Sequence, residues 1–358
     1  MLILDIFFCR LTRLSRPAIL LLCLVILPLL SACGLFSTHK TVSVSPLLTP
    51  LVDAKSNQLI AEVNRLAAVK SLHGKLDIEF EDTSFAASGI ADKYRKVDAS
   101  VTVQRPGKVY FVIQFLSVDI AKMTSDGEHF RVAVLKGDEK YKRFVKGTNN
   151  ADYGEIKANG NGKNTNQSES VKAERATVSA LSNLRPQHLT DAFLIRPIVQ
   201  PASAGYFYSQ SEFFEEEPDV RPGARKGARV VRGYYLLEEF NQSADGELRL
   251  KRRYWFDRVK AIRLARLETF EDHGVLETEV RYSAQQNLGA EQSASLPSHI
   301  ELTRRKDSYR ISMTYQAPET VSLDHDYPAD VFVLENTFGL KEVDLDANRK
   351  DSSVPNPP

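Results

Sequence analysis

Short alternating segments separated by turn residues fill most of this chain, and they constrain its fold more than any other feature. Leu76–Phe80 alternates apolar and charged residues, and Val109–Phe115 is apolar on both faces, as expected of a central strand. Asp126-Gly127 separates two such segments and favours a β-hairpin. Repeated hairpins predict one antiparallel sheet of roughly ten to twelve strands. Further strands are expected at 94–104, 123–125, 130–134, 141–145, 230–240, 248–256, 261–270, 276–282, 299–303 and 309–315, with 330–334 as an optional last strand.

Two amphipathic segments interrupt this succession of strands. Residues 53–69 carry Leu59, Val63 and further apolar side chains at three- and four-residue spacing, which predicts a helix with one apolar stripe. Residues 184–195 form a shorter candidate, since Pro186 suits the first turn of a helix. A single sheet cannot bury both of its faces, so the helices are expected to cover one of them. The expected fold class is therefore α+β.

The N-terminus has the pattern of an export signal. Three arginines precede the uncharged, apolar run 18–30, and small residues close it. The run ends in Leu30-Ser-Ala-Cys33, which resembles the lipobox of bacterial lipoproteins. The resemblance implies that the signal peptide 1–32 is removed and that Cys33 receives the acyl chains of a membrane anchor. Residues 33–52 are then an acylated tether.

An uncleaved anchor is the open alternative. Residues 18–37 carry no charge and are long enough to span a bilayer. Pro28 and the Ser-Ala-Cys-Gly patch at 31–34 argue against it, because they fall where a spanning helix is most apolar. Under either reading the rest of the chain lies outside the cytoplasm and is held to a membrane.

Charge and cysteine content narrow the class of protein. The 358 residues carry a formal net charge of +1, and removal of 1–32, with one aspartate and three arginines, leaves −1. This balance gives no basic surface for nucleic acid. Cys9 and Cys23 lie within the signal, so Cys33 alone would remain, and acylation accounts for it. The fold is therefore expected to depend on its hydrophobic core.

Polar segments mark the limits of the expected domain. Residues 147–170, rich in asparagine and glycine, are expected to be a disordered insertion, and 198–228 a second polar loop. Residues 341–358 are charged and end in proline, as expected of a disordered tail. The intervening chain shows no other linker, so 53–340 is expected to form one domain.

Four motifs carry a family resemblance: Leu72–Leu76, Gln104–Tyr110, Met123–Phe130, and Trp255–Arg258 running on to Thr269–Gly274. Their order resembles the LolA/LolB-like lipoprotein-carrier superfamily, over residues 55–145 and 175–335. The resemblance implies an open antiparallel half-barrel whose concave face is covered by the N-terminal helix and the short inserted helix. It also implies a cavity between sheet and helices that takes acyl chains.

Two sets of site residues follow from this resemblance. Candidate lining residues of the cavity are Val109, Phe111, Ile113, Phe130, Val132, Leu236, Leu264 and Leu276, with plain core as the open alternative for each. In LolB-type receptors a loop between two early strands presents an exposed apolar residue to the membrane. The corresponding turn is 115–120, where Leu116 or Val118 would make this contact, although the turn lacks the Pro-Leu-Gly of typical receptors.

Catalytic and metal-binding motifs are not found in the sequence. Gly-x-Ser-x-Gly, glycine-rich phosphate loops, Cys-x-x-Cys and His-Glu-x-x-His are all absent. Asp324-His325-Asp326 is the one cluster with ligand-like side chains, and its surroundings favour a solvated turn. We therefore expect neither an enzyme nor a cofactor nor a metal site.

Two functional hypotheses from different classes remain. The first is a monomeric, lipid-anchored binder of lipoprotein or lipid acyl chains, which transfers or sorts them at the periplasmic face and meets a periplasmic carrier protein. Gly34 after Cys33 favours the outer membrane, because an aspartate there retains lipoproteins in the inner membrane. The second is a structural or assembly lipoprotein that binds a protein partner through 147–170 or 198–228. An enzyme acting on envelope lipid is a distant third.

Overall fold

The structure, a computed structural model, describes residues 44–83, 92–93, 96–136, 139, 142–149, 151, 184–198, 205–243, 245–271, 273–289 and 294–347. The chain divides into two compact units, Met1–Pro46 and Leu47–Pro358. All elements named below belong to the second unit. The expected signal peptide, Cys33 and most of the 147–170 insertion lie outside the described residues.

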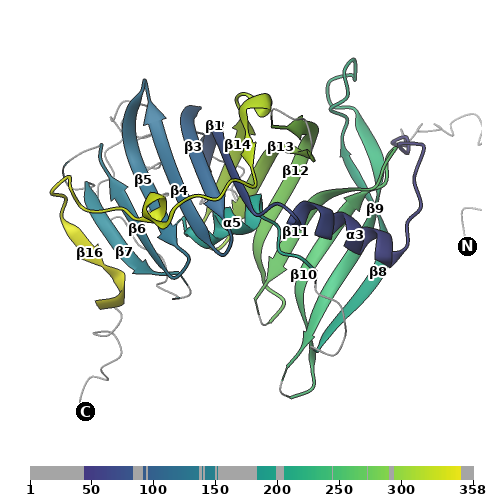
Figure 1. The fold of residues 1–358 in the computed structure, drawn as a ribbon. Coiled ribbons are helices and arrows are strands. Elements are labelled where there is room, and N and C mark those ends of the chain that lie inside the picture. Colours follow the sequence, from purple (N-terminus) through teal and green to yellow (C-terminus); the bar gives the residue numbers. More distant parts are fainter. Residues whose placement is uncertain are drawn as a thin grey trace, which may run out of the picture. The chain divides into compact units, whose positions relative to one another are not determined.

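The second unit is built on one large sheet (Figure 1). The sheet has sixteen named strands, more than the roughly ten to twelve expected. Its strands are β1 Ser71–Asp82, β2 Asp92–Lys93, β3 Val97–Gln104, β4 Lys108–Phe115, β5 Val118–Asp126, β6 His129–Val134, β7 Arg143–Thr148, β8 Tyr206–Pro218, β9 Arg229–Gln242, β10 Leu248–Asp257, β11 Arg263–Phe270, β12 Leu276–Leu288, β13 Ala294–Arg304, β14 Tyr309–Tyr315, β15 Ser322–Leu323 and β16 Glu342–Asp344. The additional strands are β8 and the two- or three-residue strands β2, β15 and β16, which are too short to show alternation. The helices of this unit are α3 Ser56–Ala67 and α5 Pro186–Phe193, with the 3-10 helices η4 Pro318–Thr320 and η5 Ala329–Phe332.

The strand order explains why the sheet is open. It runs β16-β7-β6-β5-β4-β3-β1-β14-β13-β12-β11-β10-β9-β8, with β2 and β15 paired to β1. Strand β1 therefore joins two meanders, β3 to β7 on one side and β8 to β14 on the other. Neighbours pair antiparallel throughout, except that β16 runs parallel to β7. The two ends of the order, β16 and β8, do not pair with each other, which confirms the expected open antiparallel sheet.

Three segments differ from the sequence-based expectations. Strand β8 lies inside the 198–228 segment expected as a polar loop, and it pairs with β9 along its whole length. It is an edge strand with one neighbour, and such strands carry charged side chains that make them resemble loops. Strand β16 lies in the expected disordered tail. Residues 330–334, a candidate strand, contain η5 instead.

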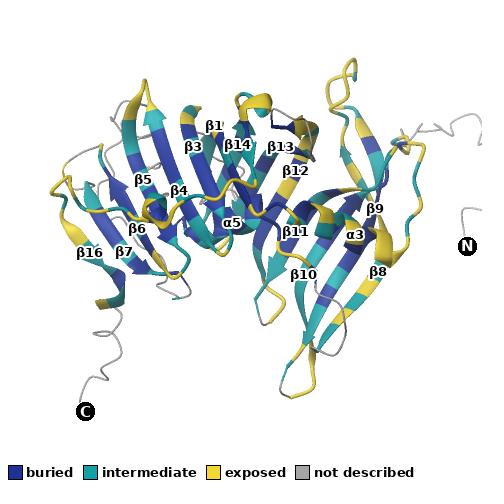
Figure 2. Ribbon diagram, viewed as in Figure 1, coloured by how far each residue is buried: buried dark blue, intermediate teal, exposed yellow. Residues whose placement is uncertain are grey.

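Both helices pack on the same face of the sheet. Leu59 and Val63 of α3 and Leu189 of α5 are fully buried, and they share one hydrophobic core with alternate residues of the strands. We call this the helix-covered face. Figure 2 shows buried positions running along most strands, and exposed ones at the turns and along the edge strand β8. The amphipathic stripe of 53–69 thus packs as its spacing indicates.

The C-terminal segment covers part of the opposite face. Phe332 of η5 is fully buried and lies beneath the Lys108 ammonium, 5.6 Å from the ring centroid. Lys108 is adjacent to Val109 in β4, so their side chains point to opposite faces. The cluster at 324–326 holds this segment in place: Asp324 accepts the backbone N–H of Lys70, and Asp326 accepts the Gln104 amide. Within the described ranges, no group of three or more ligating side chains is placed to hold a metal ion.

The hairpin between β5 and β6 yields a stability prediction. Gly127 has φ +108°, and an added Cβ would lie 2.8 Å from the carbonyl oxygen of Pro106. We expect Gly127→Ala to lower the free energy of unfolding by about 3 kcal/mol, because backbone strain and a backbone clash add together. Gly246→Ala is the matched control, with φ +85° and no atom within 4 Å, and should cost about 1 kcal/mol. Urea unfolding measures both, and equal losses would show that the Pro106 contact is unimportant.

Candidate functional site

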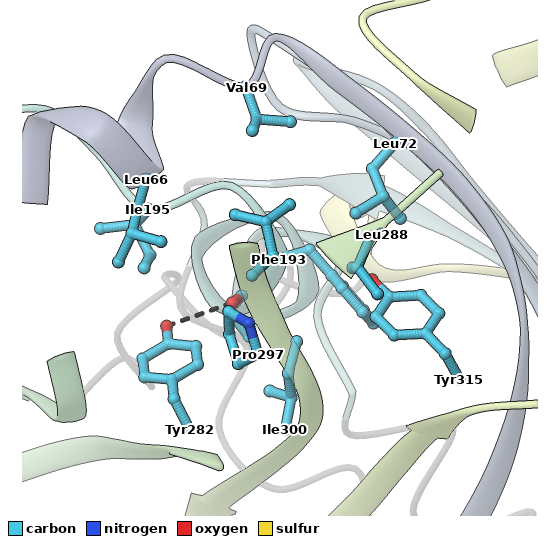
Figure 3. Close-up of a pocket in the computed structure, with 12 residues that line it drawn as sticks. Leu66, Val69, Leu72, Phe193, Ile195, Tyr282, Leu288, Pro297, Ile300 and Tyr315 are labelled. Atoms are coloured by element: carbon cyan, nitrogen blue, oxygen red, sulfur yellow. Dashed lines mark hydrogen bonds between the residues drawn. The ribbon is translucent and has the colours of Figure 1, made fainter. Parts of the chain in front are cut away.

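An apolar pocket lies where the two helices meet the sheet (Figure 3). Leu66 comes from the last turn of α3, Val69 follows that helix, and Ala192 and Phe193 come from α5. The complete lining is Leu66, Val69, Leu72, Ala192, Phe193, Ile195, Tyr282, Leu288, Leu296, Pro297, Ile300 and Tyr315. Burial raises the pKa of Tyr282 and of Tyr315, so both phenols stay neutral. The pocket therefore has an uncharged lining.

The volume of the pocket decides what it holds in this arrangement. Its cavity measures about 20 Å³. A cavity of roughly 10–15 Å³ on this measure holds one water molecule. An acyl chain therefore does not fit while α3 and α5 are both in place, and the site can accept one only if a helix moves.

Arg105 holds the ends of both helices. It follows β3, and its Nη2 donates to the carbonyl oxygens of Ala67, at 3.3 Å, and Ile195, at 2.7 Å. Its Nε donates to the carbonyl oxygen of Val69 at 3.1 Å. Ala67 and Val69 lie at the end of α3, and Ile195 follows α5. One guanidinium thus fastens both helices beside the pocket, and we call these three hydrogen bonds the Arg105 clamp.

Arg258 fixes the other end of α3. Its guanidinium donates to Asp53 at 2.7 Å and to the carbonyl oxygen of Val52 at 3.2 Å, and it stacks 4.2 Å from the ring centroid of Tyr235. Since Val52 and Asp53 directly precede the helix, α3 is held at both ends.

Helix α5 is held by fewer polar contacts. The Tyr282 hydroxyl donates to the carbonyl oxygen of Ala192 at 3.1 Å, the dashed line in Figure 3. The ring of His188 hydrogen-bonds through Nδ1 to the Tyr309 hydroxyl at 3.2 Å. After the helix, the backbone of Ile198 bonds to the amide of Asn64 in α3. Loss of the Arg105 clamp would leave α5 joined to the sheet through its apolar side and through the hydrogen bonds of Tyr282 and His188.

The structure places six of the eight expected lining residues in the core that the helices share, and none of the eight around this pocket. Val109, Phe111, Ile113, Phe130, Val132 and Leu264 are all buried in the core of the helix-covered face. Leu236 packs instead with Tyr234 and Trp255 in a separate cluster, so it does not share their core. Leu276 is half-buried at the start of β12. None of the eight is among the residues lining the pocket described above.

The pocket residues escaped the sequence analysis because distant segments bring them together. Leu66, Ala192 and Ile300 come from α3, α5 and β13, and each follows its own element's ordinary apolar pattern. One feature of the sequence could have pointed to the site. Arg105 lies in a turn between two apolar strands, where its guanidinium is close enough to the core to bond backbone carbonyl oxygens.

The turn between β4 and β5 presents exposed apolar side chains. Leu116 is 80% exposed, and Phe115 and Val118 on either side of the turn are also exposed. Leu116 and Ser117 have φ values of +48° and +64°, in the left-handed region that a leucine rarely adopts. The residues that the resemblance assigned to membrane contact therefore stand at the tip of a hairpin.

Across the described residues, no helix combines the length and apolar character needed to cross a membrane.

Similarity to known proteins is found only at the level of solved structures. No family model matches the chain, and no curated protein matches it. Among solved structures, a LolA superfamily protein from Nitrosomonas europaea is 12% identical with a TM-score of 0.39, covering 78% of this chain and 99% of that one.

Two further solved structures are similar. A DUF1329 family protein from Desulfovibrio piger is 10% identical with a TM-score of 0.36, covering 77% of this chain and 95% of that one. A domain described as an outer membrane lipoprotein-sorting protein, from Vibrio parahaemolyticus, has the same identity and TM-score over 76% and 94%. The structural neighbours of this chain thus include a protein of the LolA superfamily, the superfamily that its sequence motifs resemble.

Proposed function

We propose that this chain is a lipid-anchored, non-enzymatic binder of acyl chains at the periplasmic face of the outer membrane. It takes up lipoprotein or lipid chains in a cavity beneath α3 and α5 and passes them on, as a monomer that meets a periplasmic carrier protein. The observation that carries this proposal is the apolar pocket at the junction of two helices, whose cover depends on the Arg105 clamp.

Cargo entry requires a helix to move, because the closed pocket has about 20 Å³. When the clamp opens, water or cargo replaces the carbonyl contacts, and the core beneath the helices becomes accessible. Each methylene that is buried there contributes roughly 0.8 kcal/mol. An acyl chain can therefore offset the cost of separating the helices. Phe111, Phe130 and Leu264 would then join the pocket residues around the chain.

Transfer of this kind needs no covalent step, so it needs no catalytic group. The cavity has to shield the chain from water and still release it. The balance between the closed and the open helices sets that affinity, since the cost of opening is subtracted from every binding event.

Lipid content of the purified protein tests the proposal. A chain from residue 34 onward lacks Cys33 and keeps the whole compact unit Leu47–Pro358. We expect organic extracts of this protein from a bacterial host to contain acyl lipid by mass spectrometry, and a fluorescent fatty-acyl probe to bind saturably. Empty extracts together with no probe binding would overturn the proposal.

The small closed cavity favours one rival, a structural or assembly lipoprotein whose interior is filled by its own side chains. Under that rival, the same experiment gives no lipid and no saturable binding. A protein partner would then be sought instead.

The exposed hairpin tip yields a prediction about membrane contact. If Leu116 enters a bilayer, Leu116→Glu should weaken association of the soluble chain with lipid vesicles by about tenfold, the equivalent of roughly 1.4 kcal/mol. Val220→Glu is the matched control, since Val220 is 84% exposed in the turn between β8 and β9. Vesicle co-sedimentation measures both variants. An equal loss of vesicle association in the two variants would show that Leu116 has no special role in membrane contact.

A further inference from the structure

A buried polar cluster lies on the helix-covered face, and its members are not among the residues that line the pocket. Glu239 of β9 is 2% exposed and accepts two hydrogen bonds from Arg252 of β10, both at 2.8 Å. The Tyr208 hydroxyl of β8 donates to the same carboxylate at 3.2 Å. Burial, followed by the charge of Glu239, raises the pKa of Tyr208 to about 12, so this phenol remains a donor.

Tyr254 stands beside this cluster with an unused hydroxyl. The residue is 0% exposed, its ring lies 5.6 Å from the Arg252 guanidinium, and it belongs to the same core as the pocket residues. Its hydroxyl has no hydrogen-bond partner among the described residues. Burial raises the pKa of Tyr254, so the hydroxyl keeps its proton. Buried donors in native proteins are nearly always paired, so the unpaired hydroxyl of Tyr254 requires a physical explanation.

Tyr254 lies on the same face of the sheet as the pocket, two strands away from β12. It pairs with Leu267 of β11, and Leu267 pairs with Val280 of β12. Tyr282, which lines the pocket, follows Val280 by two residues and so points to the same face. The hydroxyl of Tyr282 already donates to the carbonyl oxygen of Ala192 in α5. Tyr254 is therefore a neutral donor on the face of the pocket, and its hydroxyl has no partner among the described residues while α5 is in place.

The surrounding charges indicate which acceptor Tyr254 suits. The guanidinium of Arg252, 5.6 Å from the centroid of the Tyr254 ring, is neutralised by Glu239, which accepts two hydrogen bonds from it at 2.8 Å. Arg252 is therefore not left to balance a carboxylate that enters beside Tyr254. A buried anion without a balancing charge is strongly disfavoured, whereas a neutral carbonyl oxygen needs only a donor.

We propose that Tyr254 is a polar subsite of the acyl-binding cavity, whose hydroxyl donates to the carbonyl oxygen of an acyl ester or amide and does not favour the carboxylate of a free fatty acid. This inference rests on the proposed function, because it assumes that an acyl chain enters beneath the helices. An ordered water on the hydroxyl is the alternative that the test has to separate.

The test compares two ligands of equal chain length, monopalmitoylglycerol and palmitate, as competitors of a fluorescent fatty-acyl probe. It uses the chain from residue 34 onward. We expect the wild type to bind the ester more tightly than the carboxylate. Tyr254→Phe should weaken ester binding by about two- to tenfold, the range for one neutral hydrogen bond, and leave palmitate binding unchanged. Its resistance to urea should be equal or greater, because the variant lacks a buried orphan group.

A matched control lies on the neighbouring strand. Tyr234 of β9 is also buried, but it lies in the separate cluster with Leu236 and Trp255, and its hydroxyl donates to Glu217. Tyr234→Phe should leave the affinity for both ligands unchanged.

The outcomes separate the subsite from the function. Unchanged ester binding in Tyr254→Phe would overturn the subsite and assign the hydroxyl to water. An equal loss for both ligands would also overturn it, because a packing defect does not distinguish them. If the wild type binds neither ligand nor the probe, the proposed function itself fails, and the subsite fails with it.

Discussion

Replacing Arg105 with leucine is expected to release α3 and α5 locally and to increase acyl-chain binding. The substitution removes the donors to the carbonyl oxygens of Ala67, Val69 and Ile195. Hydrogen bonds from a charged group contribute about 1.5–3 kcal/mol each when buried, and water recovers part of that here. We therefore expect amide exchange within α3 and α5 to accelerate by about tenfold to a hundredfold, with much smaller changes in β3 to β6.

The same substitution makes a quantitative prediction about affinity. If only the open state binds cargo, a larger open fraction raises the apparent affinity by the same factor. The increase in exchange and the decrease in the dissociation constant for an acyl probe should therefore agree. Exchange by mass spectrometry and fluorescence titration of one preparation measure the two factors.

Arg196→Leu provides the control. Arg196 also lies beside the end of α5, but its side chain is exposed and its contact is a surface ion pair with Asp191. Such pairs contribute about 0–1 kcal/mol, so neither exchange nor affinity should change much. An Arg105→Leu protein that exchanges faster throughout the sheet, with no gain in affinity, would show that the arginine merely supports the fold.

The stability of the protein should fall below about pH 6.5, the ordinary pKa of histidine, and His188 should account for a large part of the slope. His188 is buried on α5 against Tyr309, and its pKa is lowered well below the usual value by burial and then by the charges of Arg304 and Arg185. Because the folded-state pKa is depressed, the unfolded chain takes up the proton first as the pH falls. The stabilisation from neutral His188 is therefore complete above the pKa of histidine in the unfolded chain. It is lost as the pH falls toward the lower pKa of His188 in the folded protein.

Comparison with His188→Gln isolates this contribution. One group of this kind contributes about 1.4 kcal/mol per pH unit, so the wild type should lose roughly 2 kcal/mol more than the variant between pH 6.5 and 5. The difference between the two proteins removes the effect of His73, whose pKa burial also lowers. Urea unfolding at several pH values measures both curves. Parallel curves would mean that the pKa of His188 is the same in the folded protein as in the unfolded chain.

Much of the sheet could be predicted because its signals are local. The alternation of Leu76–Phe80 and the Asp126-Gly127 turn each lie within a few residues, and both appear in β1 and between β5 and β6. Strand β8 could not be read this way, since the charges that suit an edge strand also suit a loop.

The face of Leu236 was unpredictable for a different reason. Residues 234–237 are apolar without interruption and all buried, so the sequence contains no alternation that could assign each one to a face. The pocket depends on contacts between α3, α5 and the far strands, and no local pattern reports such contacts. The exposed tip at Leu116 was found through the family resemblance, and its position in a left-handed turn came only from the structure.

The proposed function requires saturable binding of an acyl chain beneath the helices. Titration of a fluorescent fatty-acyl probe into the delipidated chain from residue 34 onward measures this binding. We expect one saturable site in the wild type, competition by acyl esters, and tighter binding in Arg105→Leu. No saturable binding in either protein would contradict the proposed function, because even the released helices would then expose no site for an acyl chain.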